Sequence, residues 1–437
     1  VAVPGASRAA VATGASLAVA AASVVVAVAA AGPAAAAQVC DQPPVADTVQ
    51  AAVPWSQQAW DPAAQVWPFS TGAGVTVAVL DTGVQTSNPQ LAGRVAGGVD
   101  LVSGGTADVD CVPHGSGLAG VVVAGQQAGV GLRGLAPDAT VLPVQVAQAA
   151  VGEPGTTPVD PGVMAAGLDA AVAGGAQVVL VGPVVFRDDP QLADAVQRTL
   201  DAGVVVVAGV GDGHEADRDG EGPTAALATP YPAAYPGVLG VAAVGSDGLR
   251  ADTSQIGDYV DLAAPGAEVV STGTAAQQVY DGTAFAAAFV AAAAALVVAE
   301  PGLVPSGADR PAAVQARLAA TAVPPPSPAG YGAGLLSPGR AVTEDLAAAP
   351  PRQDPGYQAP PVDEAAVAAA RAAEDAADRS ALWALAAGAV AVLAVLTALL
   401  LPRARRRRWR TGRAAPTAVE PEPAGHIPSA ALFEPPR

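Results

Sequence analysis

Residues 75–81 read VTVAVLD, a valine-rich apolar run that ends abruptly in a carboxylate. Similar runs return further along the chain, as QVVLV (177–181), VVVVAGV (204–210) and VLGVAAVG (238–245). Their apolar residues are continuous rather than alternating, which is typical of strands that are covered on both faces. Stretches of helical length lie between them, at 162–174 and 190–202. This succession of strands and helices predicts an α/β fold, a parallel sheet with helices on both faces.

Asp81 stands where the first of these strands ends. In a parallel sheet, catalytic groups collect at the carboxyl ends of the strands, and a carboxylate beside a buried run is costly unless it has a partner. His114 follows 33 residues later in CVPHGSGLAG, just before an apolar, helix-like run. Taken alone, both residues are more readily structural than catalytic, so the decision rests on a third segment.

That segment is STGTAAQQVYDGTAFAAAFVAAAAAL (271–296), a Gly-Thr turn that runs into a long Ala-rich helix. The three motifs together resemble those of subtilisin-like serine proteases, which carry Asp-Thr-Gly, His-Gly-Thr and Gly-Thr-Ser-Phe-Ala-Ala-Pro in this order. The flanking stretches 54–84 and 231–272 are more similar still to mycosins, the membrane-anchored subtilases associated with type VII secretion. The resemblance extends over nearly the whole chain.

The resemblance implies a subtilisin-like (peptidase S8) domain over residues 71–345 and a serine endopeptidase that processes exported peptide substrates. Its catalytic positions would be Asp81, His114 and the residue that matches the nucleophilic serine. That third residue is Ala284, and a methyl group cannot attack a carbonyl.

Further positions depart from the family pattern. Asp212 stands where subtilases carry the asparagine of the oxyanion hole, and an ionised carboxylate accepts hydrogen bonds but cannot donate them. In VLVGPVV (179–185), the expected substrate strand, the usual Asn-x-Ser-Leu is missing, and Pro183, next to Gly182, lacks an N–H for an incoming peptide. These changes predict a pseudoprotease, an accessory or scaffold component that binds subunits of a secretion machinery. The alternative is an active endopeptidase that trims exported substrates.

Charge is distributed unevenly along the chain. Residues 38–380 carry 12 arginines against 36 acidic residues, whereas residues 402–437 carry 8 arginines against 3 acidic residues. A domain as acidic as the first of these regions repels phosphate groups, so no nucleic-acid partner is expected.

The basic tail follows residues 381–401, which contain no charged residue in 21 positions. At about 1.5 Å per residue, a helix of this length crosses a hydrocarbon core of roughly 30 Å, and the arginine cluster after it marks the cytoplasmic side. Residues 1–37 combine a single charge, Arg8, with an apolar stretch and a run of small residues, which predicts a secretory signal peptide. An uncleaved signal anchor is the alternative.

The sequence therefore predicts a single-pass protein of the cell membrane whose subtilase domain lies outside the cell. Its expected parts are a signal peptide (1–37), an N-terminal extension (38–70), the subtilisin-like domain (71–345), a Pro-rich linker with a juxtamembrane helix (346–380), a transmembrane helix (381–401) and a basic cytoplasmic tail (402–437).

Export permits a disulfide, and Cys40 and Cys111 are the only two cysteines of the sequence. In the chain-entropy model, closing a loop of roughly 70 residues stabilises the fold by ~4 kcal/mol. Two unrelated thiols are the alternative. No cofactor or metal is expected, because the acidic stretch 212–222 lacks EF-hand spacing and reads as a surface loop, with a bound cation as the alternative.

Overall fold

The computed structural model describes residues 48–148, 159–213, 229–325 and 329–346, together with Pro402 and Arg405. The chain divides into two compact units, Val1–Asp354 and Pro355–Arg437, and every helix and strand named below lies in the first. The expected signal peptide, transmembrane helix, most of the linker and nearly all of the tail lie outside the described residues. Within the described ranges, no helix is both long enough and apolar enough to cross a bilayer.

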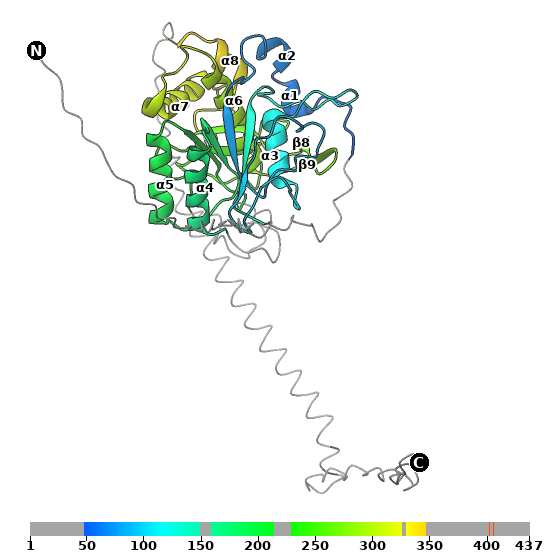
Figure 1. The fold of residues 1–437 in the computed structure, drawn as a ribbon, viewed down its shortest axis with the longest axis vertical. Helices are drawn as coiled ribbons and strands as arrows, with labels where there is room; N and C mark the ends of the chain where they lie inside the picture. The colour runs from blue at the N-terminus through cyan, green and yellow to red at the C-terminus, as the bar shows by residue number, and fades with distance from the viewer. Residues whose placement is uncertain are drawn as a thin grey trace, which may run out of the picture. The chain divides into compact units, whose positions relative to one another are not determined.

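A parallel sheet of seven strands forms the centre of the first unit (Figure 1). Its spatial order is β2-β3-β1-β4-β5-β6-β7, and each neighbouring pair is parallel. The strands are β1 (Thr76–Asp81), β2 (Val99–Asp100), β3 (Thr140–Gln145), β4 (Val178–Val181), β5 (Val205–Gly209), β6 (Leu239–Val244) and β7 (Leu262–Pro265). The predicted parallel sheet is confirmed, since the four quoted apolar runs are β1, β4, β5 and β6. An antiparallel hairpin, β8 (Val269–Thr272) and β9 (Gln277–Tyr280), forms a second small sheet.

The continuous apolar runs are explained by two separate cores, one on each face of the sheet. Along β1, Val77 and Val79 belong to one cluster of buried residues, whereas Ala78 and Leu80 belong to the other. Successive side chains of a strand point to opposite faces. A strand that is buried on both faces therefore needs an apolar residue at nearly every position.

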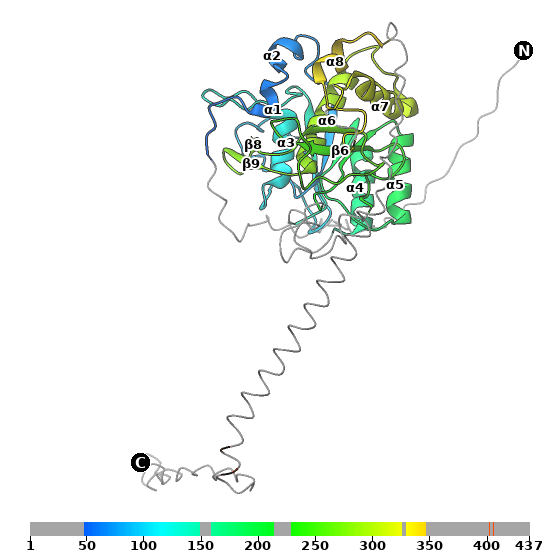
Figure 2. The same ribbon diagram turned by 180° about the vertical axis from the view of Figure 1, so that it is seen from behind.

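Helices cover both faces of the sheet, as predicted (Figures 1 and 2). Side chains of α4 (Pro161–Ala173) and α5 (Pro190–Asp201) pack into the core on one face. Those of α3 (His114–Val123) and α6 (Thr283–Ala299) pack into the core on the other. The remaining described helices are α1 (Trp55–Gln58), α2 (Pro62–Gln65), the 3₁₀ helix η2 (Gly307–Asp309), α7 (Arg310–Thr321) and α8 (Pro338–Thr343).

The helix α6 lies inside the protein rather than on its surface. Every residue from 283 to 297 is buried, and the helix packs against β4, β5 and β6. Its alanines allow the helix to approach the sheet closely, while Phe285 and Phe289 fill the larger gaps of the core. A helix that is apolar on all sides is expected to be buried, so the first turn of α6 is held firmly in place.

Part of the expected N-terminal extension is described, and it packs on the main domain. Thr48 pairs with Gln277 of β9 through two backbone hydrogen bonds of 3.0 and 3.2 Å. The Nε1–H of Trp55 donates to the carbonyl oxygens of Ala267 (3.2 Å) and Glu268 (3.1 Å).

We predict that Phe289→Ala destabilises the domain by about 3–5 kcal/mol, because it removes a ring that is 1% exposed and leaves a cavity beside Trp60. The matched control is Phe69→Ala, which makes the same change at a ring that is 52% exposed and should cost less than about 1 kcal/mol. Denaturant unfolding of the 437-residue chain in detergent, followed by tryptophan fluorescence, measures both. Equal losses for the two variants would contradict the placement of α6 in the core.

Candidate active site

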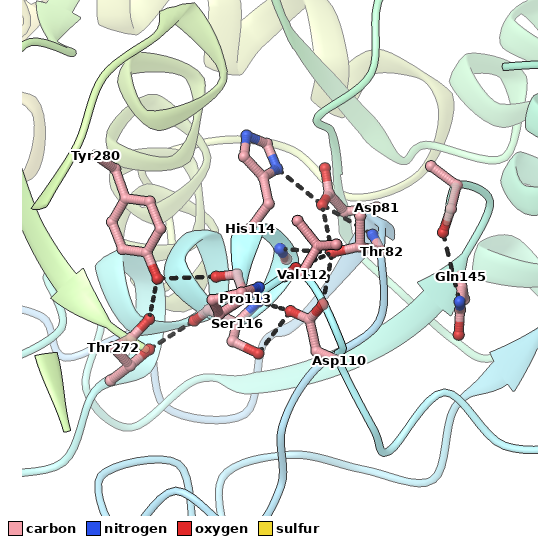
Figure 3. A network of polar contacts seen from close by, with 12 residues as sticks. Asp81, Thr82, Asp110, Val112, Pro113, His114, Ser116, Gln145, Thr272 and Tyr280 are labelled. Carbon is pink, nitrogen blue, oxygen red and sulfur yellow. Dashed lines mark hydrogen bonds and ion pairs between the residues drawn. The ribbon is translucent and has the colours of Figure 1, made fainter. Parts of the chain in front are cut away.

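Asp81 and His114 meet at the carboxyl end of the sheet (Figure 3). Asp81 is the last residue of β1 and His114 is the first residue of α3. The Nδ1 atom of His114 lies 2.8 Å from Oδ1 of Asp81, which also accepts the backbone N–H of Thr82 at 2.8 Å. The side chain of Asp81 is 2% exposed, whereas that of His114 is 20% exposed. One nitrogen of the ring is therefore tied to a buried carboxylate while part of the ring remains open to solvent.

Two glycines make room for the Asp81 carboxylate. A Cβ atom at Gly182 would lie 1.9 Å from Oδ2 of Asp81, so no other residue fits there without a shift. A Cβ atom at Gly115 would lie 3.2 Å from Oδ1 of Asp81 and 2.2 Å from the carbonyl oxygen of Gly83. The sequence assigned Gly182 and Pro183 to a substrate strand. The structure places both just beyond β4 and gives Gly182 a role in packing, while the substrate role stays a prediction.

The hairpin β8–β9 holds the start of α3 in position. The hydroxyl of Tyr280 lies within hydrogen-bonding distance of the carbonyl oxygens of Pro113 (2.9 Å) and Thr272 (2.8 Å). The hydroxyl of Thr272 donates to the carbonyl oxygen of Ser116 at 2.6 Å. These contacts come from a segment more than 150 residues away in the chain.

The surroundings of His114 favour its protonated form. Burial lowers the pKa of its imidazole, but the charge of Asp81 and the hydrogen bond to it outweigh that effect, so the pKa lies above the ordinary value of 6.5. Asp110 and Asp212 add further negative charge and raise the pKa in the same direction. The ring also packs edge-on against Phe285 of α6, with 5.1 Å between ring centroids.

The structure brings the start of α6 to this pair, where the expected nucleophile would stand. The second residue of α6 is Ala284, which is 7% exposed. The neighbouring hydroxyl, on Thr283, accepts the N–H of Gly211 at 3.0 Å and donates to Oδ2 of Asp212 at 3.2 Å. Thr283 is 1% exposed, so its hydroxyl is both buried and engaged. A hydroxyl held in this way is poorly suited to act as a nucleophile.

Asp212 follows β5 and contacts the first turn of α6. Its two carboxylate oxygens lie 2.9 and 3.0 Å from the backbone nitrogen of Thr283, whose N–H they accept. The residue as a whole is exposed, yet protein atoms desolvate its carboxylate and raise the pKa, while Thr283 and His114 oppose that rise. The sequence assigned Asp212 to the oxyanion position and missed this bond. A carboxylate that accepts N–H groups at a helix N-terminus is favourable for the helix.

Asp110 was missed by sequence reasoning altogether. It lies in the loop before α3, is 1% exposed, and accepts hydrogen bonds from Ser116 and Thr82. Burial raises its pKa to about 7. The segment DCVPH resembles an ordinary turn, and the only available signal was an acidic residue four positions before the histidine.

The expected disulfide and the expected absence of a metal both involve some residues that lie outside the described ranges. Cys111 is not a free thiol, but Cys40 lies outside the described residues, so the Cys40–Cys111 pairing stays a prediction. In the part of the chain that the structure describes, no group of three or more His, Cys, Asp or Glu residues could hold a metal ion. Most of the acidic stretch 212–222 lies outside that part, so the absence of a metal also stays a prediction.

Comparison with known proteins identifies relatives of this domain. The sequence profile of the subtilase family (Peptidase S8) matches residues 72–345. Thermitase from Thermoactinomyces vulgaris is 32% identical over 239 residues, which are 54% of this chain and 80% of that protein. Subtilisin E from Bacillus subtilis is 32% identical over 275 residues, covering 61% of this chain and 65% of that protein.

Solved structures with the same fold include two of MycP1. MycP1 from Mycobacterium smegmatis superimposes with a TM-score of 0.57 at 25% identity, covering 74% of this chain and 93% of that one. A structure described as the serine protease MycP1, an essential component of the type VII (ESX-1) secretion system, gives a TM-score of 0.57 at 29% identity. That match covers 70% of this chain and 93% of the other.

We predict that Asp81→Asn moves the titration of His114 to lower pH, because it removes the charge that raises the pKa of the imidazole. The sequence contains three histidines, so ring resonances in NMR spectra of ¹³C-histidine-labelled protein measure this directly. The control is Asp169→Asn, at a carboxylate that pairs with Arg198, which should leave the titration of His114 unchanged. An unshifted His114 in a folded Asp81→Asn variant would contradict the assigned pair.

The sign of the pH effect on stability follows from the same shift. Because the folded pKa of His114 is raised, the pair contributes its full stabilisation below about pH 6.5 and loses it as the pH rises through the folded pKa.

Proposed function

Because this chain belongs to the subtilase family, we propose that it is a mycosin-like pseudoprotease, a non-catalytic accessory or scaffold component of a type VII secretion system. The observation that carries the proposal is Ala284 at the start of α6, whose next residue, Phe285, packs against His114 of an otherwise assembled Asp81–His114 pair. The similarity to MycP1 over most of both chains supports the association with type VII secretion.

Acyl transfer of the subtilase kind needs a nucleophile that the histidine can deprotonate. Asp81 orients His114 and stabilises its protonated form, but neither residue forms the bond to the substrate carbonyl. A methyl at position 284 leaves that bond without an attacking atom. The pair is therefore able to hold a proton but has no hydroxyl from which to take it.

Asp212 weakens the second part of the machinery. In an oxyanion hole, hydrogen-bond donors face the oxygen that becomes negative, and the loss of one donor typically costs ~3 kcal/mol. An ionised Asp212 has no proton to donate, and its charge repels the developing oxyanion. The carboxylate of Asp212 already accepts the backbone N–H of Thr283 at the start of α6.

The second candidate function is an active serine endopeptidase acting on exported peptides, since its structural neighbour MycP1 is a serine protease. The 2.8 Å contact between Asp81 and His114 favours it, because this is the geometry of a working base and its orienting carboxylate. The missing serine weighs against it, and so we rank it second.

For a scaffold, the relevant features are the surface and the membrane attachment rather than the Asp81–His114 pair. In our proposal the acidic exported domain contacts subunits of the secretion machinery, and residues 381–401 anchor it in the cell membrane with residues 402–437 on the cytoplasmic side.

We predict that the purified chain shows no labelling by a fluorophosphonate probe and no peptide hydrolysis above a buffer control, since such probes report an activated serine. Ala284→Ser alone should remain about 10²–10³-fold slower than Ala284→Ser with Asp212→Asn, because only the double variant also restores a donor for the oxyanion. The asparagine keeps an oxygen to accept the N–H of Thr283.

The matched control is His114→Ala in the double variant, which should abolish any labelling that was gained. Strong labelling of the unmodified chain, lost in Thr283→Ala, would overturn the assignment of Ala284 as the nucleophile position. A double variant that folds but shows no activity would indicate that the segment of Gly182 and Pro183 also prevents catalysis.

For topology, we predict that protease added to intact cells degrades the subtilase domain and spares an epitope placed in residues 402–437. The reason is that the 21 uncharged residues before the tail span the bilayer, and the arginines that follow stay on the cytoplasmic side. Immunoblots before and after lysis measure it. Loss of the tail epitope in intact cells would contradict this orientation.

A further inference from the structure

Phe186 is an exposed aromatic residue beside the candidate active site, and it takes no part in the chemistry described above. Its side chain is 40% exposed, and it follows shortly after the end of β4. β4 and β5 are parallel neighbours in the sheet, so the segments that follow them leave the same edge side by side. One of these segments carries Pro183 and Phe186, and the other carries Gly211 and Asp212.

The tip of the Phe186 ring faces the backbone of Gly211. A Cβ atom at Gly211 would lie 3.4 Å from Cζ and 3.5 Å from Cε1 of that ring. These are ordinary contact distances, so the ring occupies space that a side chain attached to this glycine would otherwise share. Nε2 of Gln255, a buried residue, would lie 3.0 Å from the same Cβ atom. Phe186 therefore covers the glycine that directly precedes Asp212.

Two contacts fix the backbone on either side of Phe186. Val185 exchanges two backbone hydrogen bonds with Tyr231, at 2.9 and 2.8 Å. Beyond the ring, the hydroxyl of Tyr235 lies within hydrogen-bonding distance of Oδ1 of Asp188, at 3.0 Å. The rings of Tyr231 and Tyr235 also contact each other, with 4.6 Å between their centroids. Because the backbone is held on both sides, only a rotation of the Phe186 side chain uncovers the glycine.

The start of α6 lies against the same glycine. Gly211 donates its N–H to the hydroxyl of Thr283, and Asp212 accepts the N–H of Thr283. A peptide carbonyl attacked from position 284 would have its carbon beside Ala284 and its oxygen at the position of Asp212. The side chain of that peptide residue begins two bonds from the carbonyl carbon, so it needs room close to Asp212. Gly211 has no side chain and offers that room, but the ring of Phe186 takes it.

We propose that Phe186 closes the place where the reacting residue of a peptide would put its side chain, and that its ring stands there instead of a substrate side chain. The domain then excludes peptides with a large residue at that position and admits glycine. This rests on the proposed function in one respect, that a peptide carbonyl would lie beside Ala284, and it needs no nucleophile.

Opening the site has a cost in affinity. The ring must turn away from Gly211 and into solvent, which exposes apolar surface that is now in contact with the protein. Any peptide that needs the open state therefore binds more weakly by the fraction of molecules in which that state is populated. Shortening the side chain of Phe186 removes this cost.

The test measures peptide binding rather than hydrolysis, so its outcome does not depend on a nucleophile. The probes are acetyl-Ala-Ala-Ala-Phe-amide and acetyl-Ala-Ala-Ala-Gly-amide, titrated into the full chain in detergent and followed by the ring resonances of ¹³C-labelled His114. Phe186→Ala should bind the phenylalanine peptide about tenfold more tightly than the unmodified chain, because the ring of the peptide gains the burial that Phe186 has given up. The glycine peptide should bind both proteins equally.

Two further variants serve as controls. Phe69→Ala removes an exposed phenylalanine outside the candidate site and should bind both peptides like the unmodified chain. Phe186→Leu keeps a shorter apolar side chain facing Gly211, so the affinity for the phenylalanine peptide should rise, but by less than in Phe186→Ala. If Phe186→Ala fails to fold, this smaller rise in Phe186→Leu decides the question.

Equal binding of the phenylalanine peptide by the unmodified chain and by Phe186→Ala would overturn the proposal. Weaker binding by Phe186→Ala would also overturn it, because the ring would then be a contact for the peptide and not a cover. So would the absence of any response of His114 in folded Phe186→Ala. The proposed function fails by a different measurement, the fluorophosphonate labelling of the unmodified chain, so the two failures are distinguishable.

Discussion

The burial of one carboxylate, that of Asp81, constrains most of the region around it. β1 carries this group to the end of the sheet at 2% exposure, where an unpaired charge would cost several kcal/mol. One of its oxygens contacts His114 and the N–H of Thr82, while the other lies so close to Gly182 that no side chain fits there. The Asp81–His114 pair is thus part of what holds the domain together, whether or not a nucleophile is present.

The start of α6 accommodates the two residues, Ala284 and Asp212, at which this chain departs from the subtilase pattern. Ala284 continues an apolar, Ala-rich helix in the core, and alanine is the best residue for a helix interior. Asp212 lacks the donor that an oxyanion hole needs, yet its charge suits the N-terminus of the helix, where it accepts the N–H of Thr283. Both departures from the subtilase pattern are compatible with a stable domain.

The parallel sheet could be predicted because its strands are buried on both faces, which leaves a continuous apolar signature in the sequence. The motifs of Asp81, His114 and Ala284 could be placed because together they resemble the three motifs of subtilases in their order along the chain. Asp110 could not be found in this way. Its importance depends on burial and on partners from two other segments, neither of which changes the local sequence pattern.

The sequence by itself determined the fold class, the order of the site residues and the absence of a serine at position 284, because hydropathy periods and residue identities are local properties. The tertiary structure decided that Gly182 makes room for Asp81, that Asp212 binds the first turn of α6, and that Asp110 connects β1 with α3. Those features are distances between groups that are far apart along the chain. These groups become neighbours only when the folded sheet brings the ends of its strands together.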